Sequence, residues 1–224
     1  MSEPPAPAGG FVLQAITFAN GEFVQPPDLD KLLAAADLVI AADGGSQHCR
    51  ALGLRPNIVI GDLDSLDTAI RADWESNGVH FISFPAEKDQ TDLELALLHA
   101  KDVGAEKIRV LGALGRRWDQ SIANLLLLGN PQFSGLGITF LHGEQRLFVI
   151  QGKAQLKAIK GERVSLLPLN GNVTGITTLG LKYPLNSETL LFGSSRGVSN
   201  VVLSEDAEVQ VKSGILLCVI SLPE

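Results

Sequence analysis

The feature that most constrains the fold is a pattern repeated over the first 130 residues. Short apolar runs end in glycine or acidic residues, and a helical pattern follows each of them. Strands that alternate with helices in this way indicate βαβ units and a largely parallel sheet. The pattern predicts strands at 11–18, 38–42, 57–60, 79–84 and 107–111, with helices at 29–36, 46–54, 68–76, 91–103 and 118–128.

The pattern changes near residue 137, where helical periodicity largely disappears. Short apolar runs separated by glycine, asparagine and proline are typical of an antiparallel sandwich or barrel. We therefore expect an α/β fold class. It comprises an N-terminal, mostly parallel α/β sheet domain over residues 11–143 and a C-terminal antiparallel β-sandwich domain over residues 144–224. The expected strands of the second domain are 138–141, 147–150, 154–159, 163–167, 198–203, 209–212 and 215–220.

The net charge of −7 is concentrated in one stretch of the chain. Residues 62–94 contain nine acidic and two basic residues, whereas the remainder carries sixteen of each sign. Nucleic-acid-binding domains carry basic patches, so we expect no nucleic-acid partner. The two cysteines, Cys49 and Cys218, have no metal-ligand spacing and are expected in the core. No signal peptide or membrane-length apolar run is evident, so no membrane association and a cytoplasmic location are expected.

Two acidic loops are the strongest candidates for a functional site. Asp62 and Asp64 follow an apolar strand, and Asp89 and Asp92 lie in the loop that opens the helix at 91–103. Four carboxylates in neighbouring loops repel each other, and a divalent cation with oxygen ligands, such as Mg²⁺, would neutralise them. The alternative is helix capping by Asp64 or Ser65 and dipole stabilisation by Asp92.

Two glycine-containing loops are candidate phosphate sites. Asp43-Gly44-Gly45 joins a strand to a helix, and glycines let backbone N–H groups approach a phosphate. The loop at 111–120 adds Arg116 and Arg117, which suit a polyphosphate. The alternatives are tight turns, a helix cap at Asp119 and a solvated Lys88. There is no Walker A sequence, which excludes a P-loop enzyme.

These motifs together resemble the thiamine pyrophosphokinase (thiamine diphosphokinase) family, in the same order and over nearly the whole chain after residue 10. The matching segments are Asp43-Gly44-Gly45, Gly61-Asp62-Leu63-Asp64-Ser65, Lys88-Asp89-Gln90-Thr91-Asp92, Leu111 to Gln120, Thr177 to Tyr183 and Gly197-Val198-Ser199-Asn200.

The resemblance implies an enzyme that moves the pyrophosphoryl group of ATP to the hydroxyl of thiamine, giving thiamine diphosphate and AMP. It implies a homodimer whose active sites lie between the α/β domain of one subunit and the β domain of the other. Mg²⁺ would be held by Asp62, Asp64 and Asp92. The resemblance assigns catalysis to Asp62, Asp64, Asp89, Asp92 and Asp119, and substrate or nucleotide binding to Asp43, Gly44, Gly45, Ser65, Lys88, Gln90, Thr91, Arg116, Arg117, Gln120, Tyr183, Ser199 and Asn200.

The chain departs from the family pattern at a few positions. Ala113 and Arg116 replace glycines, Trp118 replaces a phenylalanine, and Tyr183 stands where some members have a tryptophan that stacks on thiamine. A tyrosine ring attracts a cation more weakly than a tryptophan ring does. Two alternatives stay open here: a pyrophosphokinase for another hydroxymethyl heterocycle such as a pterin, and a non-catalytic nucleotide or thiamine sensor.

Overall fold

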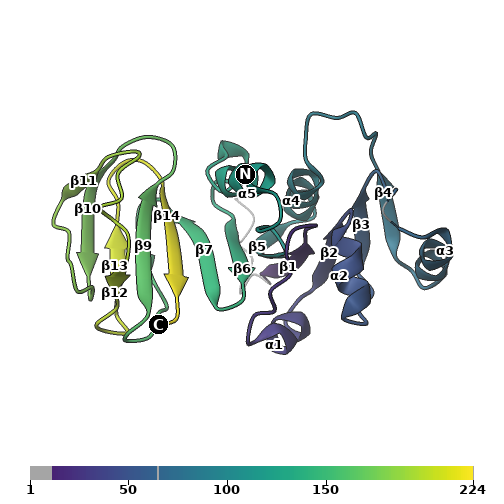
Figure 1. Ribbon diagram of the computed structural model, residues 1–224, viewed down its shortest axis with the longest axis horizontal. Coiled ribbons are helices and arrows are strands. Elements are labelled where there is room, and N and C mark those ends of the chain that lie inside the picture. The colour runs from purple at the N-terminus through teal and green to yellow at the C-terminus, as the bar shows by residue number, and fades with distance from the viewer. Residues whose placement is uncertain (1–11, 65, 224) are drawn as a thin grey trace, which may run out of the picture.

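One continuous ten-stranded sheet runs through the computed structural model, which describes residues 12–64 and 66–223. The strand order is β12-β9-β14-β7-β6-β5-β1-β2-β3-β4, and a separate four-stranded sheet has the order β11-β10-β13-β8 (Figure 1). The N-terminal part of the chain contributes six strands to the long sheet: β1 (Leu13–Phe18), β2 (Leu38–Ala42), β3 (Ile58–Gly61), β4 (His80–Ser83), β5 (Ala105–Leu111) and β6 (Gly137–His142).

Strands β1 to β6 are parallel and carry helices on both faces, as βαβ connections require. One core packs β-strand residues against Leu29, Cys49 and Trp74 of the first three helices. The opposite core contains Ala96 and the other buried residues of the fourth helix, with the end of the fifth. The helices are α1 (Leu29–Ala34), α2 (Gly45–Ala51), α3 (Thr68–Ser76), α4 (Asp92–Asp102) and α5 (Trp118–Leu127), followed by the 3₁₀ turn η1 (Pro131–Phe133).

From β7 onward every described strand pairing is antiparallel, and the two sheets enclose a third apolar core. The long sheet contributes β7 (Gln145–Ile150), β9 (Arg163–Pro168), β12 (Asn200–Val201) and β14 (Leu216–Ser221), and the short sheet consists of β8 (Lys153–Gln155), β10 (Val173–Leu179), β11 (Glu188–Leu190) and β13 (Glu208–Gln210). The predicted fold class, α/β followed by a β-sandwich, is confirmed. The domain boundary at residue 143 stays a prediction, and the sheet continues across it through the β6–β7 pairing.

The element predictions succeed best in the first half. The strand at 38–42 and the helix at 68–76 have the predicted bounds. In the second half, β10 and β11 were not predicted, and the predicted strands at 154–159, 198–203 and 209–212 are shorter. The strand at 154–159 ends at Gln155 because Lys157 takes a left-handed backbone with φ 47°. The strand at 198–203 begins only at Asn200, after Ser199 with φ 62°. Phe11, which opens the first predicted strand, lies outside the described residues.

The two cysteines are core residues, as predicted. Cys49 and Cys218 are both fully buried and free, and burial raises the pKa of each thiol to about 12. Among the residues that the structure describes, no helix combines the length and apolar character that a membrane span needs.

Candidate active site

The acidic residues after β2 and β3 come together at the carboxyl end of the sheet. Strands β2 and β3 are neighbours, with Ala42 paired to Ile60, so the residues that follow them lie side by side. Asp43, Asp62 and Asp64 each place one carboxylate oxygen within 4.8 Å of the others. This position, at the carboxyl ends of parallel strands, is where open α/β sheets bind ligands.

An unusual backbone conformation positions these carboxylates. Asp43 and Leu63 have φ values of 42° and 64°, in the left-handed region that L-residues avoid at a cost of roughly 1–2 kcal/mol. Leu63 is only 6 % exposed, so its side chain anchors the loop in the core while Asp62 and Asp64 flank it. Such backbone strain persists where the surrounding structure fixes it, and it clusters at functional sites.

Like charges dominate the electrostatics of this cluster. The charge of Asp62 is the largest influence that raises the pKa of the Asp64 carboxyl, followed by a hydrogen bond with Asp62, slight burial and the charge of Asp92. The backbone N–H of Asp64 also donates to Asp62 Oδ1 at 3.3 Å. Repulsion between these carboxylates favours a bound cation.

Asp92 lies beside the cluster at the start of α4. Thr91 caps this helix, since its Oγ1 accepts from the backbone N–H of Glu94 at 3.2 Å. Lys88 Nζ lies 2.6 Å from Asp92 Oδ1, and the two groups form an ion pair. Asp92 Oδ1 is buried and has no partner in the described structure that meets hydrogen-bond geometry. Lys88 is therefore held at the site rather than free in solvent.

A cavity of about 230 Å³ opens next to these groups. Six residues predicted for the site line it: Asp62, Lys88, Gln90, Thr91, Asp92 and Gln120. The other lining residues were not predicted for the site, and they include Asn20, Gly21, Gly115 and Asn124, although Asn20-Gly21 follows a strand in the same way as the predicted loops.

Packing explains the glycines at 44 and 45. A Cβ at position 44 would overlap the side chain of Asn20, and a Cβ at position 45 would overlap the carbonyl oxygen of Phe18. Glycine at these positions lets α2 approach β1 closely. Their predicted role in nucleotide binding stays a prediction.

The loop at 112–117 is fixed by the helix that follows it. The Ser121 hydroxyl accepts from Gly115 N–H at 3.1 Å and donates to the Arg117 carbonyl at 2.9 Å. Asn124 Nδ2 donates to the Ala113 carbonyl at 2.7 Å. Arg116 has φ 58°, which adds a third strained residue to this part of the molecule.

Arg117 and Asp119 form a two-pronged ion pair at the start of α5. Arg117 Nε donates to Asp119 Oδ1 at 3.1 Å, and Nη2 contacts Oδ2. The hydrogen bond from Arg117 is the largest cause that lowers the pKa of the Asp119 carboxyl. Neither residue lines the cavity, and neither does Asp89; Ser65 lies outside the described residues.

The predicted thiamine residues form a second group in the sandwich. Asn200 Oδ1 accepts from Tyr183 N–H at 2.9 Å, and Asn200 Nδ2 donates to the Tyr183 carbonyl at 2.7 Å, so Asn200 clamps the Tyr183 backbone. The Tyr183 side chain is 60 % exposed, and Lys182 Nζ lies 5.4 Å from its ring centroid. Ser199 N–H donates to Ser165 Oγ at 3.1 Å.

The two groups are far apart within one chain. Strand β12, which carries Asn200, is the first strand of the long sheet, while β2 and β3 are the eighth and ninth. At the usual spacing of neighbouring strands this separation is on the order of 30 Å. A single chain therefore does not bring Asn200 or Tyr183 to the acidic cluster.

Helix α5 carries an exposed apolar stripe beside the site. Trp118, Ile122 and Leu126 follow each other at intervals of four residues and are 80 %, 55 % and 54 % exposed. Residues four apart lie on one face of a helix. Apolar side chains on one exposed face of this kind indicate an interaction surface.

Comparisons with known proteins agree with the resemblance. The family model "Thiamin pyrophosphokinase, catalytic domain" matches residues 29–140, and the model "Thiamin pyrophosphokinase, vitamin B1 binding domain" matches residues 149–216. The thiamine pyrophosphokinase of Bacillus subtilis is 28 % identical over 195 residues, covering 86 % of this chain and 91 % of the relative.

Solved structures show the same similarity in three dimensions. A thiamine pyrophosphokinase crystal structure from Bacillus subtilis superposes with a TM-score of 0.80 at 26 % identity, covering 93 % of this chain and 99 % of the other. One from Geobacillus thermodenitrificans superposes with a TM-score of 0.77 at 27 % identity, covering 94 % and 97 %.

Proposed function

We propose, from the premise that this chain belongs to the thiamine pyrophosphokinase family, that its acidic cluster holds Mg²⁺ on the phosphates of ATP. The reaction itself follows from the family: the enzyme transfers the pyrophosphoryl group of ATP to the hydroxyl of thiamine and makes thiamine diphosphate. What we propose concerns the residues that carry it out and the assembly in which they act.

One observation carries the metal proposal: Asp43, Asp62 and Asp64 direct carboxylate oxygens to within 4.8 Å of one another. Three oxygen donors suit Mg²⁺, which keeps its other positions for waters and substrate phosphates. The predicted ligands were Asp62, Asp64 and Asp92. The geometry supports Asp43 as a further ligand, with Asp92 beside the cluster and engaged by Lys88.

The side chains around the cluster position the substrates. Mg²⁺, when bound, supplies positive charge to the phosphoryl oxygens as charge develops on them. Lys88, fixed by Asp92, lines the cavity and adds a second positive charge for the phosphates. Gln90, Thr91 and Gln120 offer hydrogen bonds to the substrates. Asp119 is held ionised by Arg117, which makes this carboxylate a weak proton acceptor.

We further propose a homodimer in which each active site uses residues from both chains. The separation along the sheet keeps Tyr183, Ser199 and Asn200 away from the acidic cluster of their own chain. A second copy can supply them, and the apolar stripe on α5 offers a surface for that contact. The cytoplasmic location and the lack of nucleic-acid or membrane partners stay predictions.

Metal binding tests the proposed ligands directly. Mn²⁺, which has similar ligand preferences, is titrated into EDTA-treated protein and the free ion is measured by electron paramagnetic resonance. We expect Asp62→Asn to weaken Mn²⁺ binding by about tenfold or more, because a charged ligand is lost. Glu87→Gln, an exposed acid in the same acidic stretch, is the matched control and should bind as wild type does. Equal affinity in Asp62→Asn and wild type would remove Asp62 from the metal site.

A further inference from the structure

Among residues 12–64 and 66–223, no helix or second sheet packs on part of one face of the long sheet. On that face, the core of α1, α2 and α3 includes Leu111 and Leu141, and the sandwich core includes Leu166 and Cys218. Between these two cores, residues that are paired across β5, β6 and β7 form a row on the same face of the sheet. Arg109 is paired with Thr139 and Thr139 with Phe148, and the same row continues to Cys218 and Leu166 on β14 and β9.

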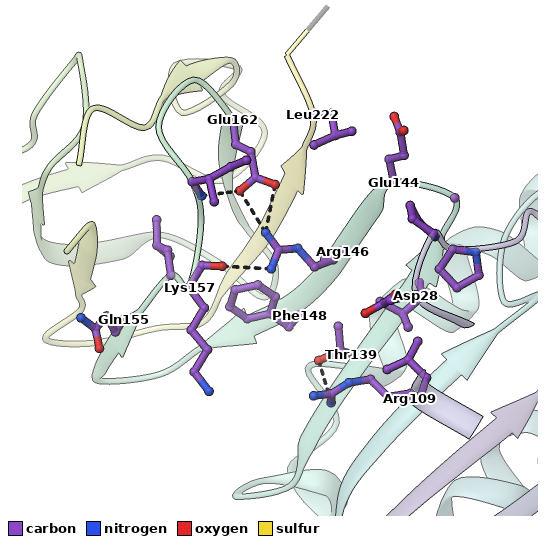
Figure 2. A pocket seen from close by; sticks show the side chains of 17 residues that line it. Asp28, Arg109, Thr139, Glu144, Arg146, Phe148, Gln155, Lys157, Glu162 and Leu222 are labelled. Carbon is purple, nitrogen blue, oxygen red and sulfur yellow. Dashed lines mark hydrogen bonds and ion pairs between the residues drawn. The ribbon is translucent and has the colours of Figure 1, made fainter. Parts of the chain in front are cut away.

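A groove of about 550 Å³ lies over this row (Figure 2). Asp28 and Leu32 line it from the side of α1, and Lys157 and Ile159 line it from the segment after β8. It shares no lining residue with the acidic cavity. Its size is within the range of small-molecule sites, and its lining combines apolar surface with a few polar groups, as such sites do.

An ion pair between Arg146 and Glu162 holds one wall of the groove in place. Arg146 Nη2 lies 3.1 Å from Glu162 Oε2, and Glu162 is 6 % exposed. Arg146 Nη1 also donates to the Lys157 carbonyl at 3.1 Å, and Glu162 Oε2 accepts from Ile159 N–H at 2.8 Å (Figure 2). These bonds fix the segment from Lys157 to Glu162, so the wall is preformed.

Unlike Arg146, Arg109 on the floor of the groove forms no ion pair with a described carboxylate. No carboxylate lies within 4.0 Å of its guanidinium among the described parts of the chain, and its hydrogen bonds to Thr139 Oγ1 and the Gly137 carbonyl are long, at 3.4 and 3.5 Å. Burial lowers the pKa of Arg109, while the charge of Asp28 opposes this. A partly buried guanidinium with five N–H donors normally finds an anion.

The residues around Arg109 indicate which kind of anionic ligand would pair with its guanidinium. In Figure 2, the side chains of Arg109 and Lys157 extend from opposite sides of the groove, with the Phe148 ring between them. Two cations suit a phosphate group, and an aromatic ring suits a planar heterocycle. Asp28 and Glu144, also in the lining, favour a ring that donates hydrogen bonds or carries positive charge.

We propose that this groove is a second ligand site, separate from the active site, for a phosphorylated aromatic heterocycle. The phosphate lies between Arg109 and Lys157, and the ring lies against Phe148. Both products of the reaction, AMP and thiamine diphosphate, belong to this chemical class and carry amino groups on their rings, so either is a suitable probe.

Calorimetric titration of AMP and of thiamine diphosphate, each into the full-length protein in EDTA, tests the proposal. Without a metal ion the acidic cluster repels phosphate, which weakens binding at the active site, and binding that depends on Arg109 reports the groove. We expect saturable binding that Arg109→Gln weakens by about tenfold, since a charge-assisted hydrogen bond is lost. Phe148→Leu should weaken it less, and inorganic diphosphate should bind about tenfold more weakly than the heterocycles. Lys160→Gln removes a nearby exposed charge outside the lining and should bind as wild type does.

The outcomes separate this proposal from the assignment of the active site. Asp64→Asn should keep groove binding, and Arg109→Gln should keep turnover at saturating substrates and Mg²⁺. If neither AMP nor thiamine diphosphate binds, or if Arg109→Gln binds them as the wild type does, the proposal of a second site is wrong. If inorganic diphosphate binds as tightly as the two heterocyclic probes, the groove does not recognise the ring. If Arg109→Gln shows a lowered melting temperature, Arg109→Lys, which keeps the charge, should restore both stability and part of the affinity.

Discussion

Replacing Asp64 by asparagine is expected to lower kcat/KM by a factor on the order of 10³ without loss of stability. Asp64 is exposed, and its carboxylate is one of three that we assign to Mg²⁺. Its raised pKa means that ionisation at neutral pH opposes folding, because the charge of Asp62 lies close by. Removing the charge without changing the shape should therefore leave the melting temperature of the metal-free protein unchanged or slightly higher.

Steady-state kinetics and thermal unfolding in EDTA measure the two effects separately. Glu87→Gln is again the matched control, because it removes one charge from the same acidic stretch but Glu87 is not one of the three clustered carboxylates. Its kcat/KM should stay near that of the wild type. Near-normal turnover in Asp64→Asn would exclude Asp64 from the reaction, and a large fall in melting temperature would mean that Asp64 has a structural role instead.

The second large effect is expected from a dimer that carries a different defect in each chain. Asn200→Ala removes the clamp on the Tyr183 backbone and should reduce turnover by about 100-fold, since substrate positioning is lost. Co-expression of Asp64→Asn and Asn200→Ala chains with two different tags yields a purified mixed dimer. If each site uses the acidic cluster of one chain and the sandwich of the other, one of its two sites is fully intact.

The mixed dimer should then have about half the activity of the wild-type dimer. Each homodimeric variant, prepared with the same tags, is the control and should remain nearly inactive. A mixed dimer that is no more active than the two parent variants would show that each site is built within one chain. A fully active monomer would contradict the dimer proposal from the start.

The parallel half of the fold could be predicted from the sequence because its signals are local. The apolar run at 38–42 is bounded by aspartate on both sides, and the helix at 68–76 starts after Asp67, whose carboxylate accepts from Ala69 N–H. Strand β10 lacks such a signal: it is rich in threonine and is interrupted by Gly175 with φ 64°. Its place in the sheet depends on pairing with distant strands, which local periodicity does not reveal.

The site shows the same division between local and non-local information. The sequence places acidic residues after strands, but it does not give the strand order. Asp43 joins Asp62 and Asp64 because β2 and β3 are neighbours, and the predicted ligand set omitted it for that reason. The left-handed conformation of Leu63 and the position of Arg109 on the floor of the groove are likewise results of tertiary packing. Nothing in the residue types alone indicates either of them.

The products that the enzyme forms from ATP and thiamine show whether the pyrophosphoryl group is transferred. Purified full-length protein is incubated with ATP, thiamine and Mg²⁺, and the nucleotides and thiamine phosphates are separated and measured over time. Transfer of the pyrophosphoryl group in one step predicts equal amounts of AMP and thiamine diphosphate, with both formed far more slowly by Asp64→Asn and neither formed in excess EDTA. Formation of ADP and thiamine monophosphate instead, or equal rates with and without the metal ion, would contradict the account.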